Sequence, residues 1–213
     1  MQAGELGSEG WNGRDAGAAL VLALITTAVV MGVAMMMLTL ASIEREGSAG
    51  FRDGAETFYA ADAALEIAMD EVAVWPSWSP LLFGGATLRW TGSASAPALP
   101  FGGTLDLPAL TAGLHADTVR SGLGADTPVW QLIGHAPFGA IWPGAGPVAH
   151  LYVAVWAADD PEDADGQPRS DTNGRIQLHA EAWGRRQSRR AVEALVKRGT
   201  PGIIRQVSWR EVR

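Results

Sequence analysis

One stretch of sequence decides the fold: residues 16–43 read AGAALVLALITTAVVMGVAMMMLTLASI and contain no charged side chain. As an α-helix, this stretch would extend about 42 Å at 1.5 Å per residue, which exceeds the roughly 30 Å thickness of a bilayer's hydrocarbon core. Its side-chain polarity comes from three threonines and one serine, whose hydroxyls can donate to backbone carbonyls of the same helix. We therefore predict a transmembrane helix over 18–43.

Two other interpretations of this stretch remain open, namely a buried helix of a soluble protein and a cleaved secretory signal. A secretory signal has an apolar region of about 7–15 residues that ends at a small-residue cleavage site. The stretch here is nearly twice that long. The leader, 1–17, carries one basic residue against three acidic ones, so the positive-inside rule does not decide the orientation. We place the N-terminus on the cytoplasmic side because the larger domain follows the span.

A helical pattern continues beyond the apolar stretch, over residues 44–74. One face recurs at alternating steps of four and three, the spacing of a continuous helix face. Its members are Phe51, Ala55, Phe58, Asp62, Leu65, Met69 and Val72. Charged side chains fall on the opposite face, as expected for contact with water or a neighbouring subunit. We predict that the helix ends near Trp75, because Pro76 and Pro80 follow.

The remainder, 75–213, predicts a β-rich head. Its first part is rich in Pro, Gly and Trp, with turn signals that interrupt short candidate strands at 86–90 and 128–133. Strand-like alternation of apolar and polar residues is clear in four later segments. They are 150–157, 175–184, 191–198 and 203–209. We predict an antiparallel meander that packs one face on the helix, an α+β fold.

Composition restricts the chemistry of this chain. It has no cysteine, which excludes disulfides, thiolate metal sites and cysteine nucleophiles. The net charge of −7 hides an asymmetry, because residues 184–213 carry a local balance of +7. The four histidines show no metal-binding spacing, and no nucleophile elbow, Walker loop or dinucleotide fingerprint is present. We predict no enzymatic activity.

Two segments resemble a known family. The run GAALVLALI from Gly17, preceded by a short hydrophilic leader, resembles the N-terminus of prepilin-like proteins, and more narrowly of PilX-like minor pilins of type IV pili. The segment FYAADAALEIAMDEV, 58–72, is similar to the Ala-rich, acid-containing stretch that closes the helix in that family. The resemblance implies that prepilin peptidase cuts between Gly17 and Ala18, leaving Ala18 as the methylated first residue.

The fifth residue of that mature chain is Leu22, where most pilins have glutamate. In the pilin family this glutamate neutralises the terminal ammonium group of the subunit ahead. Family members without it are thought to lie at the filament tip, where no subunit is ahead. The resemblance therefore implies a tip or initiating minor pilin.

An acidic loop between two predicted strands is a candidate calcium site. Its oxygen-bearing residues include Asp159, Asp160, Asp163, Asp165, Asp171 and Asn173. Calcium takes six to eight oxygen ligands, which this loop can supply, although the spacing is not that of an EF-hand. The alternative is a solvated hairpin loop whose acids discourage edge-to-edge aggregation. We predict no required cofactor, with calcium as the candidate ligand.

The arginines near the C-terminus suggest phosphate binding or, with more support, pairing with an acidic neighbouring subunit; we do not expect a nucleic-acid partner. Together these features predict a single-pass protein of a bacterial inner membrane with a periplasmic head. It would be a minor pilin of a type IV pilus, reaching the cell surface, or of a type II secretion pseudopilus. Its predicted partners are other pilin subunits and prepilin peptidase. The alternatives are a membrane-anchored periplasmic binding domain and a calcium-dependent adhesion module, neither of them part of a filament.

Overall fold

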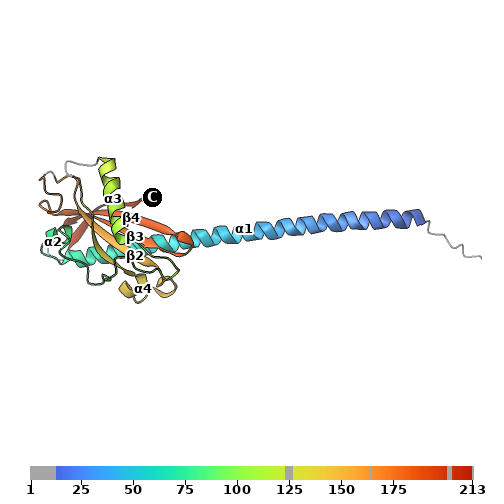
Figure 1. The fold of residues 1–213 in the computed structure, drawn as a ribbon, viewed down its shortest axis with the longest axis horizontal. Coiled ribbons are helices and arrows are strands. Elements are labelled where there is room, and N and C mark those ends of the chain that lie inside the picture. The colour runs from blue at the N-terminus through green and yellow to red at the C-terminus, as the bar shows by residue number, and fades with distance from the viewer. Residues whose placement is uncertain (1–12, 123–126, 164, 201–202, 213) are drawn as a thin grey trace, which may run out of the picture. The chain divides into compact units, whose positions relative to one another are not determined.

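A computed structural model describes residues 13–122, 127–163, 165–200 and 203–212. The chain divides into two structural units, with the boundary between Ala49 and Gly50. Helix α1, Gly13–Ala73, contributes residues to both (Figure 1). It ends two residues before the predicted position, ahead of Pro76.

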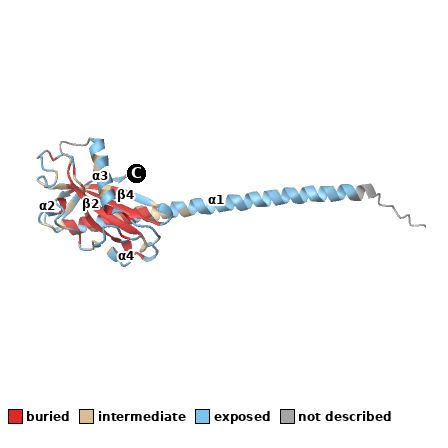
Figure 2. Ribbon diagram, viewed as in Figure 1, coloured by how far each residue is buried: buried red, intermediate tan, exposed pale blue. Residues whose placement is uncertain are grey.

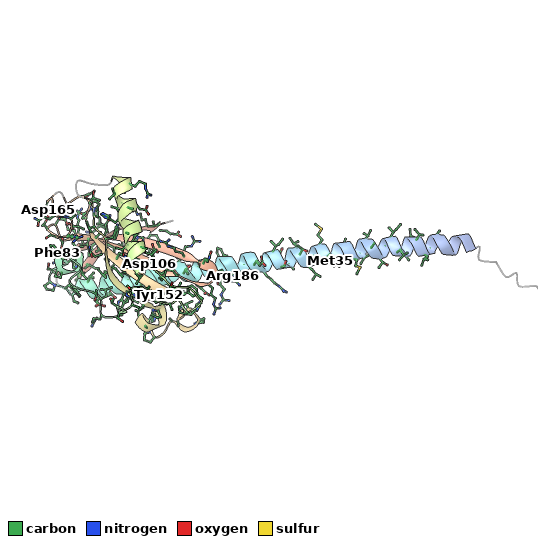
Figure 3. The ribbon with its side chains drawn as sticks, viewed as in Figure 1. Met35, Phe83, Asp106, Tyr152, Asp165 and Arg186 are labelled. Carbon is green, nitrogen blue, oxygen red and sulfur yellow. The ribbon has the colours of Figure 1, made fainter. Side chains whose placement is uncertain are left out.

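The N-terminal unit consists of the first part of α1. Every residue in 17–48 is exposed, and the side chain of Met35 stands clear of the helix (Figures 2 and 3). The threonine hydroxyls donate to backbone carbonyls one turn earlier, as at 2.7 Å from Thr26 to Leu22. Among the described residues, α1 is the one helix long and apolar enough to cross a membrane.

The second unit is built on one antiparallel sheet. Its strands are β1 (Gln131–Pro137), β2 (Tyr152–Asp159), β3 (Arg175–Trp183), β4 (Arg189–Arg198) and β5 (Ile204–Val212). Their spatial order is β1-β2-β3-β4-β5, so each strand pairs with its neighbours in sequence. The predicted antiparallel meander and the α+β fold class are both confirmed.

One face of the sheet packs on the second part of α1. Val153, Val155, Leu178, Ala180 and Val192 are fully buried there, with Leu65, Met69 and Val72 of the predicted helix face. The prediction was wrong at Phe51, which is 82% exposed. Alanines fill the interface instead: Ala60, Ala61, Ala64 and Ala68. The helix side of this interface is therefore built largely from small side chains.

The opposite face is covered by helix α3, Leu107–Ser121, which was not predicted (Figure 1). The Asp106 carboxylate caps its first turn by accepting a hydrogen bond from the Ala109 amide at 2.9 Å. Gly122 ends it in the left-handed conformation, with φ 60°. The sheet is therefore buried on both faces, not on one.

Short elements complete this unit: α2 (Ser79–Leu82), α4 (Phe138–Ile141), η1 (Gly146–Val148) and η2 (Arg185–Gln187). The expected strand at 86–90 does not form. Instead, the Leu88 and Gly92 amides donate to carbonyls of β1, at 2.7 Å to Ile133 and 2.8 Å to His135. This contact lines the outer edge of β1, whereas β5 forms the other edge of the sheet.

Candidate functional site

The residues implied by the pilin resemblance lie early in α1. Gly17 and Ala18 are helical and exposed, and Leu22 is 68% exposed. Residues 1–12 of the predicted leader lie outside the described part of the chain. The described geometry therefore leaves the Gly17–Ala18 peptide bond within a helix, so a peptidase would have to unwind this turn or meet it unfolded.

The described surface of the N-terminal unit is mainly apolar and is exposed to its surroundings. Its large side chains from Leu20 to Ile43 are between 48% and 75% exposed. Soluble monomers rarely expose apolar patches beyond a few hundred Å², and larger ones mark membrane or protein contacts. With no charged residue in this stretch, the surface suits hydrocarbon or the apolar faces of other helices.

The acidic loop between β2 and β3 is held together by its own carboxylates. Asp163 Oδ2 accepts from the Thr172 hydroxyl at 2.8 Å and from the Asn173 amide at 3.2 Å. Asp171 Oδ1 accepts from the Gly174 amide at 2.7 Å, and its Oδ2 lies 3.3 Å from Arg198 Nη2. Both carboxylates thus accept hydrogen bonds from groups of the same loop and hold its backbone in place, which is a structural role.

Two other carboxylates of this loop retain an oxygen without a hydrogen bond, namely Oδ2 of Asp159 and of Asp165. Asp159 is 2% exposed, and burial, together with the charges of Asp163, Asp171 and Asp165, raises its pKa to about 7. Among the described residues, no group of three or more acidic or histidine side chains is arranged to hold a metal ion. Calcium binding by this loop stays a prediction.

The face of the sheet below α3 carries a polar network that was not predicted from the sequence. At its centre, His179 Nδ1 lies 2.9 Å from Glu193 Oε1, and Nε2 lies 3.0 Å from Glu181 Oε1. Arg189 binds both oxygens of Glu181, at 2.8 and 2.7 Å. Arg210 Nε donates to Glu193 at 2.8 Å. The edges of Trp130 and Trp156 pack against the imidazole.

The charges in this network support one another. Burial alone would lower the pKa of His179, but hydrogen bonds to Glu181 and Glu193 and their charges raise it. Burial alone would raise the pKa of Glu181, yet hydrogen bonds from His179 and Arg189 lower it. The network therefore alternates cations and anions, and both ring nitrogens of His179 are engaged. It is suited to hold three strands in register, and it offers no activated nucleophile.

A groove of 400 Å³ opens beside this network, lined by residues of β3, β4, β5 and the acidic loop. Glu193 and Arg210 form part of its wall, and each is already paired with the other. The signal for the network was present in the sequence, because Gln177, His179 and Glu181 alternate along β3. Which residues of β4 and β5 lie beside these side chains depends on the strand register, and the sequence alone does not give that register.

The remaining histidines and arginines do not come together. His135 pairs with the Tyr152 hydroxyl at 2.8 Å, and His150 bonds the Pro147 carbonyl. Arg186 lies 2.6 Å from Asp53, and Arg198 stacks 4.3 Å from the ring centroid of Trp78. Such pairs tie the sheet to α1 and its following loop.

Comparisons of the chain with protein-family models, with curated proteins and with solved structures found no match.

Proposed function

We propose that this chain is a membrane-anchored, non-catalytic subunit of a pilin-like filament, of the type IV pilus or type II secretion pseudopilus class. The observation that carries the proposal is the division of α1. Its residues 18–43 expose a charge-free apolar surface, whereas Leu65, Met69 and Val72 of the same helix belong to the core of a β-sheet head. A helix of this kind stores a subunit in a bilayer and leaves its head outside.

Two further features support the same function. Within the described residues nothing covers the apolar surface, so it requires contact with lipid or with neighbouring helices. A filament subunit would contact lipid first and neighbouring helices after assembly. Leu22 also lies on this surface in place of the pilin glutamate. This substitution favours the tip or initiating position, where no terminal ammonium ahead requires neutralisation.

The mature N-terminus tests the proposal. Protein from the native membrane should begin at a methylated Ala18 when prepilin peptidase is present and keep its leader when it is absent. Gly17→Val should block the cut, while the matched Gly13→Val should leave it intact. Mass spectrometry reads each start site. A chain that starts at Met1, or at any peptidase-independent position, would reduce the proposal to a simple membrane-anchored domain.

The calcium-dependent alternative has one observation in its favour, the unpaired buried oxygens of Asp159 and Asp165. If calcium binds, 1 mM Ca²⁺ should raise the melting temperature of the purified chain, and Mg²⁺ should not substitute. Asp159→Asn and Asp163→Asn should remove the increase. An unchanged melting curve between EDTA and Ca²⁺ would eliminate this alternative.

A further inference from the structure

A groove on α1, within the unit of residues 50–213, is separate from the surfaces described above. It has a volume of 620 Å³ and lies between α1 and the end of α4. Its lining residues are Tyr59, Asp62, Ala63, Glu66, Ile67, Ile141 and Trp142. Tyr59 is 68% and Trp142 48% exposed. The groove therefore offers an apolar floor with two aromatic walls.

One margin of the groove is formed by Asp62 and Glu66, and Asp70, outside the lining, extends this row of acids along α1. Asp62, Glu66 and Asp70 follow one another at steps of four residues, and like charges at this spacing destabilise a helix. Burial and the neighbouring charges of Asp62 and Asp70 raise the pKa of Glu66. The next acids along the helix have basic partners, Arg52 for Glu56 and Arg89 for Glu71. Among the described residues, no basic side chain pairs with the row itself.

We infer that this groove receives an amphipathic α-helix from a different protein subunit. The apolar face of that helix would cover Tyr59, Ile67 and Trp142, and its lysines or arginines would pair with the acidic row. The inference rests on the proposed function, since it names the kind of neighbour that the head of a filament subunit would contact. It also explains why repelling charges lie beside an exposed apolar surface.

Geometry favours a helix over an extended segment. Successive acids of the row are about 6 Å apart along α1, the rise of four helical residues. A second helix lying alongside α1 presents basic residues at the same spacing, with its axis roughly 8–10 Å away. An extended segment in the groove would face side chains only, so its backbone amides and carbonyls would lack partners there. A helix satisfies these groups internally.

Charge distinguishes this occupant from two others. A lipid with an anionic headgroup would be repelled by the row. A second copy of this chain fits poorly, because none of its described helices carries two basic residues four positions apart. Its arginines near the C-terminus lie on β4, β5 and the turn before β4. The groove thus matches a different subunit, one with a basic amphipathic helix.

The full chain, reconstituted in phosphatidylcholine nanodiscs, can be tested with defined peptides. The probe is a fluorescent 18-residue Leu/Ala helix with lysine at every fourth position; the matched peptides carry glutamate instead, or the same lysines with a central proline. Fluorescence anisotropy, corrected with empty nanodiscs, gives each affinity. We expect the lysine helix to bind at least about ten-fold more tightly than either matched peptide, given the strength of exposed ion pairs and the helix-breaking effect of proline.

Matched variants locate the binding on the protein. Asp62→Asn, Glu66→Gln and Asp70→Asn together should weaken the lysine helix about ten-fold, and 1 M salt should do the same. The Trp209 indole donates to the Asp62 carboxylate at 3.1 Å, and the Asp62→Asn variant keeps a side-chain carbonyl oxygen for that bond. Trp142→Ala should weaken binding through the apolar wall. Asp117→Asn, on α3, changes the same kind of charge elsewhere and should have no effect.

Equal affinity for the lysine and glutamate helices, or binding that survives neutralisation of the row, would overturn the inference. A proline peptide that binds as well as the lysine helix would do so too, since it would remove the requirement for a helix. This result is independent of processing at Gly17. A chain that is cut and methylated but binds no basic helix keeps the proposed function and loses the groove.

Discussion

The two faces of the five-stranded sheet are both buried, but by different physics. The face toward α1 is predominantly apolar, with valines, alanines and leucines such as Leu178 against an alanine-rich helix. The face toward α3 combines aromatic side chains with the network centred on His179. Alternate residues of the same strands therefore point into two cores that are stabilised in different ways. The apolar face gains stability from buried area alone, whereas the other face is stable only while its charges stay paired.

The largest expected effect comes from breaking the charged face. Glu181→Ala removes a carboxylate that is 1% exposed and leaves His179 and Arg189 without their shared partner. Breaking a buried pair by removing one member costs about 3–5 kcal/mol. Chemical denaturation of the full chain in detergent measures the loss. Glu162→Ala, at a side chain 77% exposed, is the control and should cost under about 0.5 kcal/mol. A loss below about 1 kcal/mol at Glu181 would mean that the network contributes little.

The apolar face should respond somewhat less, and without dependence on charge. Leu178→Ala leaves a cavity between β3 and α1 and should cost about 3 kcal/mol. The matched exposed site is Val207→Ala on β5, where the loss should be a few tenths of a kcal/mol. Denaturation at two pH values tests the contrast, because the Leu178 effect should not change with pH. A pH-dependent loss would show that the two faces are coupled.

The fold was predictable where periodicity was strong. Alternation of apolar and polar residues predicted strands at 150–157 and 175–184, and the structure confirms both as β2 and β3. The membrane-type stretch followed from the absence of charge. Boundaries of the four clearly predicted strands differ by up to three residues, since strand ends depend on pairing with the next strand, as with β5 from Ile204 to Val212.

The prediction failed where alanine and long-range register decide the structure. Ala61 and Ala64 carry too little hydrophobicity to identify a helix face, yet both are fully buried in the core between α1 and the sheet. Helix α3 had readable signals, with Asp106 and Pro108 at its start and Gly122 at its end. They were obscured by the surrounding turn residues. The His179 network depends on strand register and was not accessible from local pattern.

Titration separates the two faces in a third way. Asp159 is the last residue of β2, on the face toward α1, and its pKa is raised to about 7. Between pH 3.8 and about 7 the folded state therefore keeps a proton on this carboxyl group that the unfolded state has released. Its contribution to stability therefore falls as pH rises from about 4 to 7. His179, with its pKa raised above 6.5, contributes fully below pH 6.5, and this contribution is lost as pH rises through its folded-state value.

In the window set by Asp159 the slope of the unfolding free energy should approach about 1.4 kcal/mol per pH unit. Asp159→Asn should remove the decline between about pH 4 and 7, while His179→Gln should remove the decline that begins once the pH rises above 6.5. Denaturation series from pH 4 to 9 measure both. If a single variant removed both declines, the two groups would belong to one titrating unit and the contrast between the faces would be lost.

The smallest effect concerns the turn that joins β3 to β4 and belongs to neither face. Arg186 and Gln187 there have φ angles of 52° and 58°, the left-handed region that tight hairpin turns usually fill with Asn-Gly. Replacing Gln187 by glycine relieves strain in the folded chain but adds freedom to the unfolded chain. We expect a net gain of about 0.5 kcal/mol. Gln177→Gly, in the regularly paired backbone of β3, should lose about 0.5–1 kcal/mol.

This opposite pair of signs isolates backbone conformation from side-chain loss, because the same glutamine is removed in both variants. Neither change touches a buried group, so the pH profile of each variant should follow that of the parent chain. A gain at Gln187 with an altered pH profile would mean that the turn strains the His179 network through Arg189, which lies two residues away and binds Glu181. The two faces would then be mechanically linked through their shared hairpin, and the division between them would hold for composition but not for energetics.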